Sequence, residues 1–220
     1  MNDKIVKFSL ILFLFIVSSC SNKSPVFGEN GMVVSTSRHA SQVGIDILQA
    51  GGNAIDAAAA VGFALAVTSS SNGNIGGGGF MTAKLANGEV FTLDYREMAP
   101  KSANRDMYLD KDGNIIKGKS RSTHFASGVP GSVDGLLKAW RDYGSGVISR
   151  DQLMGPAIKL AREGFDLSIY EAERFNKNKE RLSKHSETKR IFTRDDREWK
   201  KDDIFKLVIL DETDAMTDDA

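Results

Sequence analysis

The sequence holds a single cysteine, Cys20, and carries no net charge. One cysteine excludes a disulfide within the chain. A neutral chain has no excess of basic side chains with which to neutralise phosphates, and this argues against a nucleic-acid partner. No apolar run reaches the roughly 20 residues that a membrane-spanning helix needs.

Common catalytic and metal-binding patterns are also missing. The sequence has no G-x-S-x-G elbow for a serine nucleophile and neither H-x-x-x-H nor C-x-x-C spacing for a metal ion. Of the three histidines, His185 lies in a densely charged segment and is expected at the surface. We therefore expect neither a metal nor another cofactor.

The amino terminus has the pattern of an export signal. Lys4 and Lys7 precede the uncharged run 8–17, which is too short to span a bilayer and fits a signal peptide. The following V-S-S-C resembles a bacterial lipobox. This resemblance implies removal of residues 1–19, acylation of Cys20, and a lipid-anchored protein in the bacterial periplasm or cell envelope. The alternative is an ordinary secretory signal with an incidental cysteine. Residues 20–30 are polar and are predicted to form a tether.

The next segments predict a strand followed by a helix. Residues 31–37, G-M-V-V-S-T-S, have the apolar and β-prone composition of a strand. Val43, Ile47 and Leu48 then form an apolar helical stripe, and Gly51 with its glycine neighbour is a typical helix end.

A second helix and a hairpin are predicted further along. Residues 53–67 are rich in alanine and have almost no polar face, which indicates a helix buried on more than one side. Residues 80–85 and 90–95 are β-prone runs, and Asn87-Gly88 between them is a strong hairpin signal.

Capping patterns predict the later helices. One helix is expected to begin near Ser132. Two further helices are predicted by capping boxes, in which a serine is followed three residues later by a glutamine or glutamate. These pairs are Ser149 with Gln152, and Ser168 with Glu171. The segment 171–203 is dense in charges of both signs, which indicates a solvated helix and loop surface.

Four consecutive glycines, Gly76 to Gly79, admit two interpretations. Freed backbone N–H groups could bind a phosphate, but the lysine and hydroxyl residue of a P-loop do not follow. The run lies between a predicted buried helix and a predicted buried strand. We therefore favour a structural role, in which backbone approaches backbone where a Cβ would clash.

Arg96 is the candidate ligand-binding residue. It follows the second strand of the predicted hairpin, so it is expected to project from a sheet edge into a cleft. A guanidinium can hold a carboxylate through two parallel hydrogen bonds. The alternative is a structural ion pair with Asp94 or Glu97, and the residues alone do not decide between the two.

Five collinear segments together resemble the large-subunit portion of the gamma-glutamyltranspeptidases (glutathione hydrolases). They are D-I-L-Q-A-G-G-N-A-I-D-A-A-A-A-V-G-F-A-L-A-V, G-N-I-G-G-G-G-F-M, L-D-Y-R-E-M-A-P, H-F-A-S-G-V-P-G-S-V and P-A-I-K-L-A-R-E-G-F. The resemblance runs over residues 31–205. It implies an α+β fold of the N-terminal-nucleophile hydrolase class, the αββα sandwich, present here as its incomplete N-terminal part.

The resemblance also implies an activity and a binding residue. In this family a precursor cleaves itself, and a threonine at the new amino terminus of the small subunit attacks the gamma-glutamyl amide, with its own amine as base. The family's R-E-M-A-P arginine holds the substrate α-carboxylate and corresponds to Arg96. The implied substrate is glutathione or another gamma-glutamyl compound.

The sequence also departs from the family. Family precursors are far longer, and the nucleophile and oxyanion glycines belong to a small subunit that this sequence lacks, so we expect the chain alone to be inactive. Thr123 in S-T-H-F resembles the start of a small subunit, but H-F-A-S-G-V-P-G-S-V after it matches the large one, so we do not expect Thr123 to be the nucleophile. Residues 206–220 are expected to be an atypical acidic tail. A non-catalytic lipoprotein that binds gamma-glutamyl compounds or amino-acid carboxylates is the alternative function.

Overall fold

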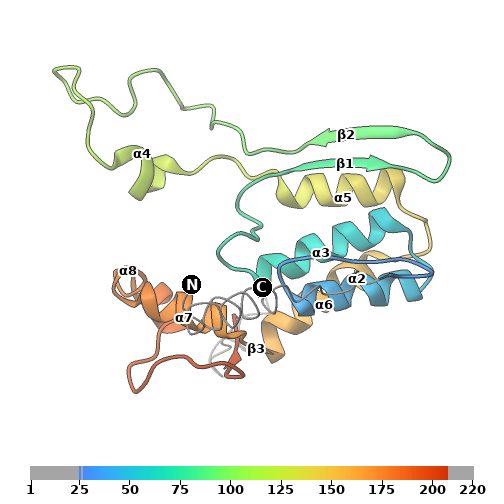
Figure 1. The fold of residues 1–220 in the computed structure, drawn as a ribbon. Coiled ribbons are helices and arrows are strands. Elements are labelled where there is room, and N and C mark those ends of the chain that lie inside the picture. The colour runs from blue at the N-terminus through green and yellow to red at the C-terminus, as the bar shows by residue number, and fades with distance from the viewer. Residues whose placement is uncertain (1–24, 26, 208–220) are drawn as a thin grey trace, which may run out of the picture. The chain divides into compact units, whose positions relative to one another are not determined.

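The structure is a computed structural model that describes residues 25 and 27–207. Cys20, the predicted signal peptide 1–19 and the tail from residue 208 lie outside the described residues, as does part of the predicted tether. The order of elements, shown in Figure 1, is α2 (Arg38–Gln49), α3 (Ala54–Thr68), β1 (Phe80–Lys84), β2 (Val90–Asp94), α4 (Lys119–Ser122), the 3-10 turn η1 (His124–Ala126), α5 (Ser132–Tyr143), α6 (Arg150–Glu163), β3 (Phe165–Asp166), α7 (Ile169–Lys177), α8 (Lys179–Leu182), α9 (Ser186–Phe192) and β4 (Ile204–Phe205).

Helix α3 is the centre of the core. Helices α2, α5 and α6 all pack against it, and its alanines Ala59, Ala60 and Ala64 are completely buried. Small side chains allow these helices to approach α3 closely from several directions. The prediction of a helix buried on more than one side is therefore confirmed.

The first predicted helix ends as its glycines indicate. Gly51 has a φ of +92°, and its N–H donates to the Leu48 carbonyl, while the Gly52 N–H donates to the Ile47 carbonyl. This pair of bonds is the Schellman arrangement, which needs a left-handed residue after the helix. Glycine adopts that conformation without a Cβ penalty.

The two predicted capping boxes are present at α6 and α7, and α3 carries a third, formed by Asn53 and Asp56, that was not predicted from the sequence. At α6 the Ser149 hydroxyl accepts from the Gln152 N–H at 3.2 Å, and the Gln152 side chain accepts from the Ser149 N–H at 2.9 Å. Residues 171–203, expected to form a solvated surface, contain α7, α8 and α9 with most charged side chains exposed.

We expect Ser149→Ala to lower the free energy of unfolding by about 1 kcal/mol, because the Gln152 N–H loses its acceptor at the start of α6. Urea denaturation followed by circular dichroism measures this change. Ser102→Ala, at an exposed serine in the loop after β2, is the matched control. Equal stability of Ser149→Ala and the unchanged chain would contradict the capping assignment.

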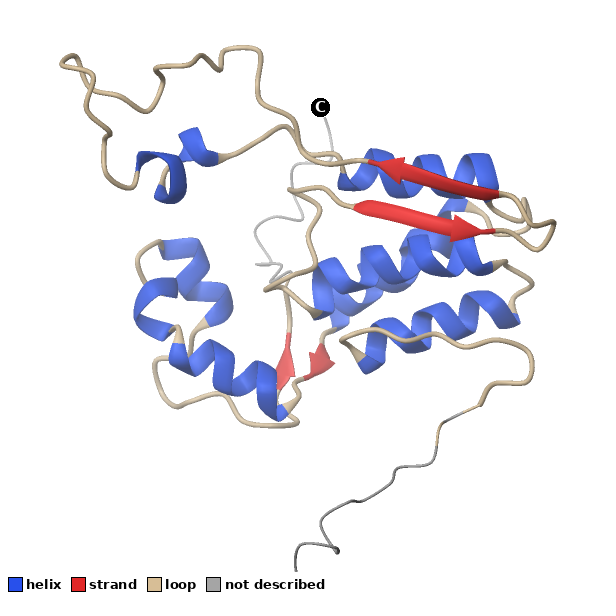
Figure 2. Ribbon diagram, turned by 45° about the horizontal axis from the view of Figure 1, so that its top comes forward, coloured by secondary structure: helices blue, strands red, loops and turns tan. Residues whose placement is uncertain are grey.

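The predicted hairpin is also present. Strands β1 and β2 pair antiparallel with Thr82 opposite Thr92, and Gly88 in the turn has a φ of +88°. One face of the hairpin packs towards α3 and α5 and buries part of Met81 and Phe91 (Figures 1 and 2). The opposite face, which we call the outer face, carries the exposed side chains of Phe80, Thr82, Lys84, Val90, Thr92 and Asp94.

The prediction of a strand over residues 31–37 is wrong. The structure assigns no strand there, because a strand needs a hydrogen-bonded neighbour and the described residues provide none for this segment. Val33 nevertheless packs against α2 beside Gly44, so its apolar character serves the helical core.

The described residues form a mixed helix and strand structure, which confirms the α+β class. Their sheets are the hairpin β1–β2 and the short antiparallel pair β3–β4. In residues 25 and 27–207, no helix is both long enough and apolar enough to cross a membrane.

Candidate substrate-binding site

Arg96 lies just beyond the end of β2 and continues the alternation of that strand. Tyr95 turns inwards against Gly135 of α5, so Arg96 projects on the outer face with Asp94. Its side chain is 60% exposed. The guanidinium carbon lies 5.9 Å from the centre of the Phe80 ring.

Two carboxylates contact Arg96, and they contact different parts of it. The Asp94 carboxylate accepts from the Arg96 backbone N–H at 3.0 Å and so fixes the turn after β2. The Glu97 carboxylate accepts from Nη2 of the guanidinium at 3.2 Å. The ion pair with Glu97 that the sequence left open is therefore present, but it occupies one guanidinium nitrogen, and a guanidinium has five N–H donors.

The electrostatics of the segment follow from its hydrogen bonds and burial. The pKa of Glu97 is lowered, first because its carboxylate interacts with its own backbone N–H and second because Arg96 donates to it. Burial raises the pKa of the Tyr95 hydroxyl. At neutral pH, Glu97 is therefore ionised and partly balances the charge of Arg96.

Glycines on two sides hold the backbone of Arg96. A Cβ built on Gly78 would lie 2.5 Å from the Arg96 Cα and 2.4 Å from the Glu97 nitrogen. A Cβ on Gly131 would lie 2.2 Å from the Tyr95 carbonyl oxygen. Real Cβ atoms do not approach backbone so closely, so only glycine fits at either position.

The same two glycine segments are hydrogen-bonded to one another. The Gly77 carbonyl accepts from the N–H groups of Gly131 and Ser132 at 2.8 and 3.0 Å. The predicted structural role, a close backbone approach, is confirmed for Gly78. A Cβ on Gly77 or Gly79 would instead meet side chains, and one on Gly76 would meet no atom within 4 Å. The loop that leads from α3 into β1 packs against residues 95–97 and the start of α5.

Asn74 and Ser132 complete this arrangement, and the sequence reasoning missed both. The Asn74 side-chain oxygen accepts from the Gly77 N–H at 2.7 Å and from the Ser132 hydroxyl at 2.9 Å. The only sequence feature that singles out these residues is their position: Asn74 lies just before the four glycines, and Ser132 lies at the predicted start of a helix. Neither position reveals that the two residues meet.

The remaining candidate residues do not join this site. The Thr123 hydroxyl donates to the Lys119 carbonyl at 2.7 Å at the end of α4. His185, expected at the surface, is exposed. In the described part of the chain, no cluster of three histidine, cysteine or acidic side chains could hold a metal ion.

The fold and the site together define an α+β chain in which an exposed arginine follows a β-hairpin, with its backbone packed closely against glycines. A family model described as gamma-glutamyltranspeptidase matches residues 40–213, and the chain belongs to this family. The match extends to residue 213, whereas the resemblance in the sequence motifs ends at residue 205.

Relatives and solved structures agree with the family. The chain is 55% identical over 154 residues to a glutathione hydrolase proenzyme of a Pseudomonas species (strain A14), covering 70% of this chain and 26% of that protein. It is 46% identical over 187 residues to the glutathione hydrolase proenzyme of Escherichia coli (strain K12), covering 81% and 31%. The crystal structure of Helicobacter pylori gamma-glutamyltranspeptidase superposes with a TM-score of 0.77 at 42% identity, covering 83% of this chain and 52% of that one.

The chain thus spans between a quarter and a third of the length of these two curated relatives. The residues that the family model matches include the R-E-M-A-P segment, residues 96–100.

Proposed function

We propose that this chain supplies the large-subunit part of a gamma-glutamyltransferase and glutathione hydrolase. In the complete enzyme, the described helices and hairpin would form one half of an αββα sandwich of the N-terminal-nucleophile class. The observation that carries the proposal is the position of Arg96: glycine backbone holds it on the exposed outer face of the hairpin, inside the segment that matches the family.

The role of Arg96 would be to bind the α-carboxylate of the gamma-glutamyl group. The guanidinium offers N–H groups beyond the one used by Glu97, and its planar shape matches a carboxylate. Holding the substrate by its α-carboxylate would place the gamma-glutamyl amide at a fixed distance from Arg96. Fixing the position of the reacting bond in this way contributes to the rate of reaction. The bond-breaking threonine would come from a small subunit outside this sequence.

The location of the protein is part of the same proposal. Export by the signal peptide 1–19 and acylation at Cys20 would place it at the bacterial periplasm or cell envelope, on a lipid anchor. Mass spectrometry of membrane-extracted protein tests this: a diacylglyceryl cysteine at the new amino terminus is expected, and an unmodified Cys20 would contradict it.

A hybrid proenzyme tests the function. Residues 33–207 replace the aligned segment of the Escherichia coli relative, which supplies the remaining length. We expect the hybrid to cleave itself and to release p-nitroaniline from gamma-glutamyl-p-nitroanilide, whereas the full chain by itself releases none. The unchanged relative is the positive control.

Two results would contradict the proposal. A hybrid that is cleaved but inactive would mean that this segment does not support turnover of the substrate. Turnover by the full chain alone that disappears in Thr123→Ala would place the nucleophile within it. Saturable binding of glutathione by the full chain together with an inactive hybrid would instead favour the non-catalytic binding protein.

A further inference from the structure

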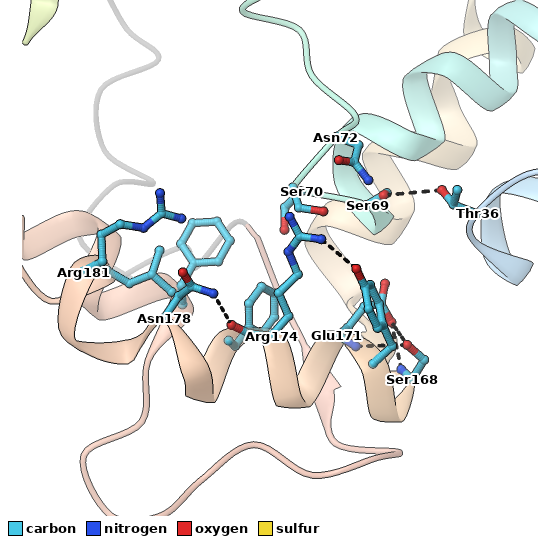
Figure 3. Close-up of a pocket in the computed structure, with 14 residues that line it drawn as sticks. Thr36, Ser69, Ser70, Asn72, Ser168, Glu171, Arg174, Asn178 and Arg181 are labelled. Atoms are coloured by element: carbon cyan, nitrogen blue, oxygen red, sulfur yellow. Dashed lines mark hydrogen bonds between the residues drawn. The ribbon is translucent and has the colours of Figure 1, made fainter. Parts of the chain in front are cut away.

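A cavity lies away from Arg96, between the turn that follows α3 and the helices α7 and α8. Its volume is about 700 Å³, a size typical of sites for small organic ligands. Figure 3 shows the turn residues Ser69, Ser70 and Asn72 on one side and the helical residues on the other. None of its lining residues belongs to the Arg96 site.

The helical wall carries two arginines that pair with no carboxylate in the part of the chain that the structure describes. Arg174 of α7 and Arg181 of α8 both line the cavity, and Figure 3 shows that the Arg174 side chain ends beside Ser70. Arg174 is half-buried, and its Nη1 donates to the Tyr170 hydroxyl at 2.9 Å. Within the described residues, neither guanidinium has a carboxylate within 4.0 Å, whereas Arg190 and Arg197 nearby are each paired with one.

The acidic residue of the lining is already engaged. Oε2 of Glu171 accepts from the N–H and the hydroxyl of Ser168 at 2.8 and 2.7 Å, as part of the cap of α7. Its charge therefore serves the start of the helix, where a carboxylate is favoured by the helix dipole. Because two arginines line the cavity against this one glutamate, the lining carries a net positive charge.

The floor of the cavity is apolar, and its opposite wall is polar. The apolar side of the cavity is lined by Phe175, Leu182 and Phe192. The two phenylalanine rings contact edge to face, with 5.6 Å between their centres. The exposed side chains of Ser70 and Asn72 face these groups from the turn. An anionic group near the arginines would thus have hydrogen-bond donors across from it and an apolar surface beside it.

We propose that this cavity binds an organic anion in which a carboxylate is attached to an apolar body. Arg174 and Arg181 would hold the carboxylate, because guanidinium groups match it in shape and charge. The aromatic floor would bury the apolar body. This site goes beyond the proposed function, since neither arginine takes part in the Arg96 site.

Isothermal titration calorimetry on the full chain at low ionic strength tests the proposal. The probe is 3-phenylpropionate, and the comparison ligands are its neutral amide, acetate and inorganic phosphate. We expect saturable binding of 3-phenylpropionate and at least about tenfold weaker binding of the other three, because each lacks either the charge or the apolar body.

Variants locate the binding. Arg174→Gln and Arg181→Gln are expected to weaken 3-phenylpropionate binding about tenfold each, and Arg181→Lys less than Arg181→Gln, because lysine keeps the charge. Arg150→Gln, at an exposed arginine of α6, is the matched control and leaves binding unchanged. Arg96→Ala also leaves it unchanged, which separates this site from the proposed substrate site. Circular dichroism confirms that each variant is folded.

Several results would overturn the proposal. They are absence of 3-phenylpropionate binding, equal binding of the neutral amide, phosphate binding as tight as that of 3-phenylpropionate, and loss of binding in Arg96→Ala with retention in Arg174→Gln.

Discussion

Arg96→Ala is expected to lower kcat/KM of the hybrid proenzyme for gamma-glutamyl-p-nitroanilide by about a hundredfold or more. Removing one partner of a hydrogen-bonded charge pair typically costs about 2–5 kcal/mol. Arg96→Lys should recover only part of the loss, because an ammonium group keeps the charge but cannot form two parallel bonds. Initial rates over a range of substrate concentrations give kcat and KM separately for each variant.

Glu97→Gln separates the two interpretations of Arg96. If Arg96 serves only as the partner of Glu97, the glutamine variant should lose as much activity as Arg96→Ala. If Arg96 binds the substrate carboxylate, Glu97→Gln should retain most of the turnover. Arg105→Ala, at an arginine whose side chain is 96% exposed, is the matched control and should behave like the unchanged hybrid. Full activity of Arg96→Ala would refute the assignment.

Gly131→Ala and Gly78→Ala are expected to be the most destabilising single changes at this site. Each added Cβ would lie within 2.6 Å of backbone atoms of residues 95–97, and backbone cannot move aside as the end of a side chain can. Overpacking of this kind costs roughly 1–3 kcal/mol and occasionally more. For a chain of this length, about 3 kcal/mol corresponds to a fall in Tm of roughly 6–12 °C.

Gly76→Ala provides the control within the same loop. A Cβ at Gly76 meets no atom within 4 Å, and its φ lies outside the left-handed region. This variant should be as stable as the unchanged chain or slightly more stable, because alanine restricts the unfolded state. Differential scanning calorimetry compares the three variants. Equal Tm values for Gly131→Ala and Gly76→Ala would mean that the glycine contacts do not hold the Arg96 segment.

Local patterns predicted the elements that depend on neighbours in sequence. The end of α2 at Gly51, the capping box at Ser149 and the hairpin turn at Gly88 each involve atoms a few residues apart. The apolar composition of α3 likewise predicted burial on several sides. These features need no knowledge of the rest of the fold, because their hydrogen bonds close within one turn.

Patterns that depend on distant partners were predicted less well. The composition of residues 31–37 indicates a strand, but a strand exists only where another pairs with it. The run of four glycines indicates a close backbone approach, but it reveals neither that Gly78 is the glycine that meets backbone nor that its partners are residues 95–97. The contact of Asn74 with Ser132 joins residues 58 positions apart, and nothing in the local sequence of either points to the other.

The sequence by itself determined the longer helices α2, α3, α5, α6 and α7, the hairpin, the family and the identity of the arginine that marks the proposed substrate site. Only the tertiary structure decided which face of the hairpin carries Arg96, which glycines fix its backbone, and that Arg174 and Arg181 share a cavity. The physical reason is that caps and turns are satisfied by hydrogen bonds between near neighbours in sequence. The backbone contacts around Arg96, and the net positive charge of the cavity lined by Arg174 and Arg181, arise only when distant segments pack together.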